Sequence, residues 1–158
     1  MRVGITGHRR LSHEIVGQVE ARLAERLRRY DPAALTVVTC AAEGPESRLA
    51  RVALDAGAAL EIVVPADDHR ATLSSEHLPV YDDLVKQARR VHRTGLETST
   101  PQARQTAGEI LVGLSDELLA VWDGRPALGY GGTADTVAYA LGVHLPVTVV
   151  WPEDAARP

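Results

Sequence analysis

The chain contains no phenylalanine, and aromatic residues make up only 4% of its 158 residues. Leu, Val, Ile and Ala must therefore build the core. The single cysteine, Cys40, excludes an internal disulfide, so we expect a reducing compartment, the cytoplasm. No apolar run approaches the roughly 20 residues that cross a bilayer. We therefore expect no membrane association, and because Met1 leads straight into a strand-like segment, we expect no signal peptide.

Lysine is also nearly absent, since Lys86 is the only one among the 17 basic residues. The net charge of −4 disfavours a sequence-independent nucleic-acid surface. The six histidines show no metal-ligand spacing such as HxxxH, so we expect no metal site. Ordinary fractions of hydrophobic and charged residues, 45% and 24%, are typical of a globular domain.

Short apolar runs alternate with helical periodicity along the whole chain. This alternation predicts an α/β fold, a Rossmann-like three-layer α/β/α sandwich whose mostly parallel sheet has five to six strands. The expected strands are 2–6, 35–39, 60–64, 117–122 and 146–151, with a further short strand at 91–93 as an alternative to a loop. The expected helices are 12–30, 48–56, 79–91, 101–114 and 134–141. We expect one domain, residues 1–152, and a C-terminal tail, residues 153–158.

Two glycine-rich turns follow expected strands, and such turns bring backbone N–H groups to a helix N-terminus that attracts anions. The first contains Gly7, His8 and Arg9. The second contains Gly129, Gly131, Gly132 and Thr133. A flexible connection is the alternative reading of either turn. Together they predict a nucleotide site in which backbone amides hold phosphate, with Arg9 adding charge.

Further polar residues follow other expected strands. Glu43, beside Gly44, is expected to accept ribose hydroxyls or act as a general base, or else only to favour the next helix. Asp123 is expected to contact ribose or to stabilise its own turn. Asp135 is a weaker catalytic candidate, and Arg70 a candidate from a closing loop whose alternative is simple solvation.

These segments resemble the Smf/DprA–Lonely Guy superfamily, called SLOG, over residues 2–151. The similar motifs are Val-Gly-Ile-Thr-Gly-His-Arg from Val3, Ala-Ala-Glu-Gly from Ala41, Leu-Ala-Val-Trp-Asp-Gly from Leu119 and Gly-Gly-Thr-Ala-Asp-Thr-Val-Ala-Tyr-Ala from Gly131. The resemblance implies a Rossmann-like sheet that binds nucleotides or their derivatives. Members of the superfamily include phosphoribohydrolases, DNA-binding proteins and nucleotide sensors.

One position departs from the phosphoribohydrolase signature Pro-Gly-Gly-x-Gly-Thr-x-x-Glu. Thr136 stands where the catalytic glutamate is required, and a hydroxyl cannot stabilise an oxocarbenium-like centre as a carboxylate does. Asp135 lies one residue away, which rotates it by about 100° around a helix. The resemblance therefore favours binding over that chemistry.

The leading hypothesis is a cytoplasmic domain that binds a nucleotide, such as a nucleoside monophosphate or an ADP-ribose-like molecule, and serves as a sensor module. It requires no cofactor beyond this ligand. The alternative is an enzyme that cleaves a nucleotide N-glycosidic bond, with Glu43 as the catalytic carboxylate and Asp123 or Asp135 assisting. A DNA-binding module is the third hypothesis. We also expect a homodimer formed through the helices at 79–91 and 101–114.

Overall fold

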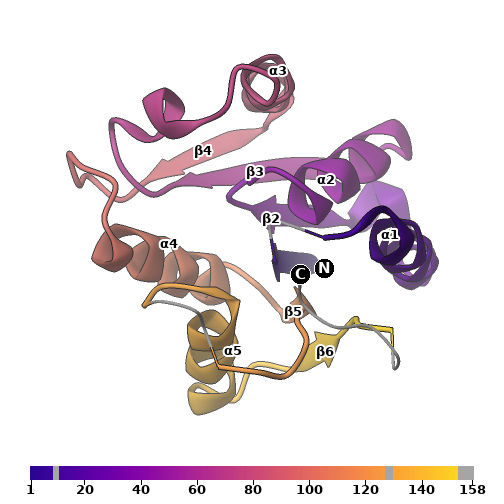
Figure 1. Ribbon diagram of the computed structural model, residues 1–158. Coiled ribbons are helices and arrows are strands. Elements are labelled where there is room, and N and C mark those ends of the chain that lie inside the picture. The colour runs from indigo at the N-terminus through magenta and orange to yellow at the C-terminus, as the bar shows by residue number, and fades with distance from the viewer. Residues whose placement is uncertain (9–10, 127–129, 153–158) are drawn as a thin grey trace.

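The computed structural model describes residues 1–8, 11–126 and 130–152, and six parallel strands form its central sheet (Figure 1). The strand order is β4-β3-β2-β1-β5-β6. The strands are β1 (Arg2–Gly7), β2 (Thr36–Thr39), β3 (Ala59–Val64), β4 (Arg90–Arg93), β5 (Glu117–Val121) and β6 (Val147–Val149). The helices are α1 (His13–Leu27), α2 (Pro45–Asp55), α3 (Leu78–Gln87), α4 (Pro101–Gly113) and α5 (Thr133–Gly142), with short 3₁₀ turns at Pro32–Ala34 and His69–Thr72.

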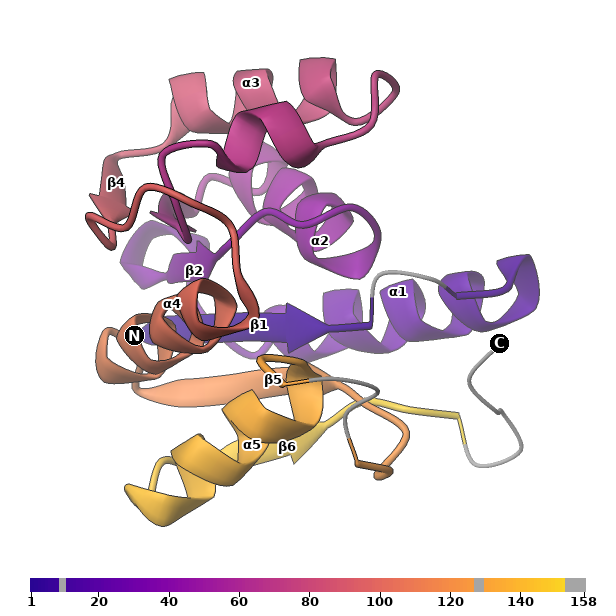
Figure 2. The ribbon, with the colours of Figure 1, turned by 60° about the vertical axis from the view of Figure 1, so that its left-hand side comes forward.

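The helices form two layers, as the predicted three-layer sandwich requires (Figure 2). α1, α2 and α3 pack on one face of the sheet, where Val3, Ile5 and Leu60 are fully buried. α4 and α5 pack on the other face, against Val38 and Leu118. Alternate residues of each buried strand enter these two cores, which is why the strands read as nearly continuous apolar runs.

Local sequence signals set several helix boundaries. The hydroxyl oxygens of Ser12 and Thr100 accept hydrogen bonds from N–H groups of the first turns of α1 and α4. α2 begins at Pro45, three residues before the expected start, because proline suits the first position of a helix. α3 ends at Gln87, so the expected extension to Val91 was wrong.

The short strand predicted at 91–93 is confirmed as β4, the edge strand beside β3. Val91 pairs with Ile62 in the parallel ladder. Val91 cannot belong both to this ladder and to α3, so the helix ends before the strand begins. The helical spacing of the apolar residues alone did not indicate this end.

A buried carboxylate lies within the sheet, on the side that α4 covers in part. The Glu61 side chain is 2% exposed and accepts two hydrogen bonds of 2.8 Å from the Arg2 guanidinium. Arg89 Nη2 and His92 Nε2 lie 3.1 and 2.7 Å from its oxygens. Hydrogen bonding to Arg2 is the main cause that holds the pKa of Glu61 well below its ordinary value of 4.5.

The strand order changes direction between β1 and β5. The chain leaves β1 toward α1 on one face and leaves β5 toward α5 on the other. A crevice beyond the carboxyl ends of two such strands is the usual ligand position of an open parallel sheet. Gly7 and His8 of the first turn, and Gly131 to Thr133 of the second, lie at this edge.

Candidate functional site

His8 and Asp123 meet at the carboxyl ends of β1 and β5. The Asp123 backbone N–H donates to His8 Nε2 across 3.3 Å, and Asp123 Oδ1 lies 3.4 Å from the same nitrogen. Their side chains are 12% and 3% exposed. The edge of the His8 ring also faces Trp151, with 5.6 Å between ring centroids. The structure therefore brings together two residues that the sequence assigned to one cleft.

Gly7 is explained by packing at the same place. A Cβ atom on Gly7 would lie 2.7 Å from the Cβ of Val121, so any side chain would separate β1 from β5. Arg9, the predicted charged member of the first turn, lies outside the described residues.

Gly131 is the described residue of the second turn that most needs to be glycine. Its φ is +83°, and a Cβ there would lie 2.5 Å from the carbonyl oxygen of Pro101. Its N–H donates to Asp135 Oδ2 across 2.9 Å. The loop at Gly131 is therefore held between the first turns of α4 and α5. Asp135 stabilises the conformation of this loop by accepting the hydrogen bond. Gly129 lies outside the described residues.

Among the described residues, no side chain caps the N-terminus of α5. Gly132 is its N-cap and supplies no side-chain hydrogen bond. Within the described part of the chain, no hydrogen bond engages the backbone N–H groups of Gly132, Thr133 or Ala134, or the Thr133 hydroxyl. Such a set of donors, at the positive end of a helix dipole, is suited to a phosphate.

Arg104 is a site candidate that the sequence did not indicate. A Cβ atom on Gly131 would lie 3.2 Å from the Arg104 Cβ, which places this arginine beside the second glycine turn. Among the described residues, Arg104 forms no ion pair. The sequence did offer one signal, because Thr100-Pro101 predicts the start of a helix. Since α4 connects the parallel strands β4 and β5, its first turn, which contains Arg104, lies at the carboxyl edge of the sheet.

Thr136, at the position of the phosphoribohydrolase glutamate, lies in the contact between α4 and α5. Its side chain is buried, and a Cβ on Gly108 would lie 2.7 Å from its Oγ1. The hydroxyl also lies 3.5 Å from the Gly132 carbonyl oxygen. This threonine therefore serves helix packing.

Glu43 lines a cavity of about 610 Å³ at the carboxyl edge, whose described lining residues include neither His8 nor Asp123. The walls come from Leu11 and Val16, from the loop and first turn that carry Glu43, Gly44, Pro45 and Arg48, and from Thr72, Leu73 and Ser74. Gly44 adopts a φ of +104° as the N-cap of α2. No hydrogen bond or ion pair between described residues joins Glu43 to Asp123.

Arg70 is engaged at the surface. Its guanidinium donates two hydrogen bonds, of 2.9 and 2.8 Å, to the carboxylate of Asp82. Both side chains are largely exposed, and this pairing raises the pKa of Arg70 and lowers that of Asp82. The position and pairing of Arg70 match the solvated alternative.

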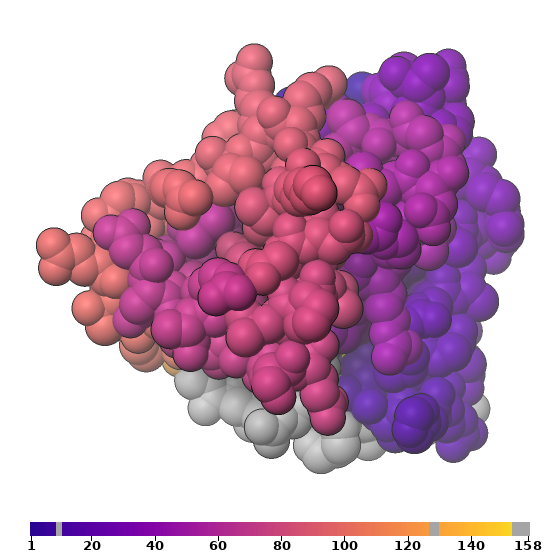
Figure 3. Space-filling view, turned by 90° about the horizontal axis from the view of Figure 1, so that it is seen from above, coloured from indigo at the N-terminus to yellow at the C-terminus, as the bar shows by residue number. Residues whose placement is uncertain are grey.

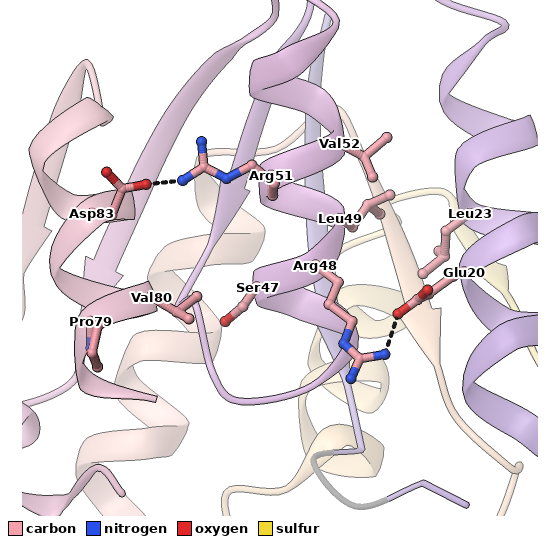
Figure 4. A pocket seen from close by; sticks show the side chains of 10 residues that line it. All are labelled: Glu20, Leu23, Ser47, Arg48, Leu49, Arg51, Val52, Pro79, Val80 and Asp83. Atoms are coloured by element: carbon pink, nitrogen blue, oxygen red, sulfur yellow. Dashed lines mark hydrogen bonds and ion pairs between the residues drawn. The ribbon is translucent and has the colours of Figure 1, made fainter. Parts of the chain in front are cut away.

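A second cavity, of about 680 Å³, lies over α2 between α1 and α3 (Figure 4). Two ion pairs span it, Glu20–Arg48 and Arg51–Asp83, and Leu23, Leu49 and Val80 are among its apolar lining residues. It contains none of the predicted site residues. In the space-filling view, the chain segments from α3 to α1 lie side by side across this face (Figure 3).

No helix in the described ranges is long and apolar enough to cross a membrane. A search of residues 1–8, 11–126 and 130–152 for three or more clustered His, Cys, Asp or Glu side chains finds no group that could hold a metal ion.

Proteins of known structure share this arrangement of strands and helices. The DNA processing protein A of Helicobacter pylori, studied for its single-stranded DNA binding, superimposes with a TM-score of 0.68 at 14% identity over 94% of this chain. DNA processing protein A of Streptococcus pneumoniae gives 0.66 at 16% identity over 94%. The molybdenum cofactor carrier protein of Chlamydomonas reinhardtii gives 0.59 at 19% identity over 94%. The fold is Rossmann-like.

The chain spans 64%, 49% and 74% of the lengths of these three proteins, respectively. No protein-family model matches the chain, and no curated protein matches it. The structural neighbours agree with the resemblance to the SLOG superfamily at the level of the fold. At 14–19% identity, these neighbours do not identify the ligand of this chain.

Proposed function

We propose that this domain binds a nucleotide or nucleotide derivative at the carboxyl edge of its sheet, with a phosphate at the N-terminus of α5. The observation that carries the proposal is the helix terminus at Gly132 and Thr133, which no described side chain caps and which the close contact of Gly131 with α4 holds in place. Arg104 supplies a cation beside it. Backbone amides and a guanidinium are the donors that phosphate groups prefer.

Binding is proposed rather than glycosidic cleavage, because Thr136, at the position of the phosphoribohydrolase glutamate, packs between helices. Cleavage stays the alternative hypothesis and is detected in the same samples as released free base. One structural neighbour is described by its single-stranded DNA binding, but the net charge of −4 here disfavours that function. A cytoplasmic location and a homodimer remain expectations, and sedimentation velocity decides the second.

Replacing Gly132 by Asp should abolish ligand-induced stabilisation without loss of fold. Aspartate is a favourable N-cap, so its carboxylate would occupy the free amides and repel a phosphate. A thermal-shift panel of nucleoside monophosphates and ADP-ribose is the measurement. For wild type, a ligand at 100 times its Kd should add about 2.7 kcal/mol, or roughly 5–10 °C in Tm. A panel that leaves both proteins unchanged contradicts the proposal.

Arg104→Gln should weaken binding of the nucleotide selected by that panel by about 10-fold, because a charge-assisted hydrogen bond to phosphate is lost. Arg29→Gln is the matched control, since Arg29 is exposed in the turn after α1 and the change in net charge is identical. Titration calorimetry at two salt concentrations compares the variants. Equal affinities for Arg104→Gln and Arg29→Gln would show that only the overall charge matters.

A further inference from the structure

Two buried side chains fix the loop that carries Glu43. Ser47 Oγ lies 3.0 Å from the carbonyl oxygen of Ala41 and 2.5 Å from that of Ala42. His77 Nε2, from the segment before α3, lies 2.9 Å from the same Ala41 oxygen. Ser47 and His77 are each 4% exposed. Ala41 adopts a φ of +55°, a conformation that a non-glycine residue holds only where its surroundings impose it.

The hydrogen-bond chemistry assigns these side chains a positioning role. A carbonyl oxygen only accepts, so His77 must carry a proton on Nε2 to donate to Ala41. The Ser47 hydroxyl likewise donates to a carbonyl oxygen, although His77 Nε2 lies 3.4 Å away. With both donors directed at the backbone, the pair does not have the arrangement of a nucleophile and its base.

His77 also joins the two walls of the Glu43 cavity. Its side chain binds the Ala41 carbonyl in the loop after β2, and its backbone N–H donates to Ser74 Oγ across 3.2 Å. Ser74 belongs to the opposite wall. His77, three residues after Ser74 in the same turn, therefore links this wall to the loop that carries Glu43.

The polar groups of this cavity suit a neutral ligand that offers hydroxyl groups. Glu43 is exposed and forms no hydrogen bond or ion pair within the described chain, so its oxygens are open acceptors. Thr72 Oγ1 donates to the His69 carbonyl and is left as an acceptor. Ser74 accepts from His77 and keeps a proton to donate. Arg48 also lines the cavity, but its guanidinium is already paired with Glu20 across 2.6 Å.

We propose that the Glu43 cavity is a subsite for the vicinal diol of a ribose, and that His77 is its positioning residue. The cavity volume of about 610 Å³ is within the range of small-molecule sites, and Leu11, Val16 and Leu73 provide apolar contact for an attached base. A carboxylate that accepts from both hydroxyls distinguishes a ribose from its deoxygenated analogues. The assignment rests on the proposed nucleotide function for the identity of the ligand.

The test uses two probes on the full chain, followed by NMR amide shifts. Adenosine, which has no phosphate, reports on the Glu43 cavity, and 2′,3′-dideoxyadenosine lacks the diol. Inorganic pyrophosphate reports on the N-terminus of α5. We expect adenosine to shift the amides of Gly44 and Ser74, and dideoxyadenosine to bind at least about 10-fold more weakly.

Variants separate recognition from positioning. Glu43→Gln should weaken adenosine binding about 10-fold, whereas the neighbouring exposed Glu76→Gln should not. His77→Phe keeps a ring but removes the donor, and should weaken adenosine binding while leaving pyrophosphate binding unchanged. His77→Gln, which restores an N–H donor near the position of Nε2, should recover part of the affinity.

The two probes make the failures distinguishable. Absence of adenosine binding to wild type, or equal binding of adenosine and dideoxyadenosine, overturns the ribose subsite. Unchanged adenosine affinity in Glu43→Gln has the same consequence, and unchanged affinity in His77→Phe overturns the positioning role. If adenosine discriminates as expected but pyrophosphate does not bind, the phosphate site at α5 is wrong and the ribose subsite stands.

Discussion

Replacing Glu61 by Gln should lower the free energy of unfolding by about 3 kcal/mol at pH 7. The carboxylate is 2% exposed and is the common partner of Arg2, Arg89 and His92. A neutral amide cannot accept the paired hydrogen bonds from Arg2 at full strength, and its NH₂ group would face other donors. Urea denaturation followed by circular dichroism measures the loss.

The difference between wild type and Glu61→Gln should also depend on pH. Hydrogen bonding to Arg2 keeps the pKa of Glu61 below its ordinary value of 4.5 in the folded state. The folded carboxylate therefore binds a proton less readily than the unfolded one. Its contribution is fully present above pH 4.5 and is lost as the pH falls below that value. The two unfolding free energies should converge in acid.

The matched control is Glu20→Gln. Glu20 pairs with Arg48, but both side chains are more than one-third exposed, so water screens the interaction. This variant should cost less than about 1 kcal/mol. Equal losses for Glu61→Gln and Glu20→Gln would mean that the buried charges stabilise the sheet no more than a surface pair does.

Gly131→Ala should destabilise the domain by about 2 kcal/mol or more and remove nucleotide-induced stabilisation. A φ of +83° costs an L-residue about 1–2 kcal/mol. The added Cβ would also lie 2.5 Å from the Pro101 carbonyl oxygen, so the loop or α4 must move. Thermal unfolding with and without the nucleotide selected by the panel measures both effects.

Gly142→Ala, at the C-terminal end of the helix that follows Gly131, is the control. No atom lies within 4 Å of a Cβ built on Gly142. Alanine favours helix over glycine, so this variant should be neutral or more stable by up to about 1 kcal/mol, with an unchanged ligand response. A Gly131→Ala protein that unfolds and binds like Gly142→Ala would show that the close contact with α4 is not needed.

Much of the fold could be predicted because it depends on local patterns. The alternation of buried strands with amphipathic helices gave the layered α/β class, and Ser12 and Thr100 marked helix starts that the structure confirms. The boundary of α3 was wrong because Val91 satisfies both a helical spacing and a parallel ladder. Pairing with β3, a segment distant in sequence, decides between them.

The candidate site was predicted less completely. The glycine turns and His8 with Asp123 were expected at one edge, and the described part of each turn lies there. Arg104 and His77 were missed. Each lies at the start of a helix, α4 or α3, and the position of that helix depends on the order of the strands that it connects. Glu43 was expected in the same cleft, and the described lining of its cavity contains neither His8 nor Asp123, so this part of the site stays a prediction.

The sequence by itself determined the class of fold, the edge at which loops gather and the need for glycine in the second turn, since these follow from periodicity and backbone stereochemistry. Only the tertiary structure decided which groups meet. Glu61 meets Arg2 from β1, His92 from β4 and Arg89 just before β4. The loop that carries Glu43 is held by His77, which lies 34 positions further along the chain. Such contacts depend on strand order and register, which fix the partners of a side chain only when the whole sheet has formed.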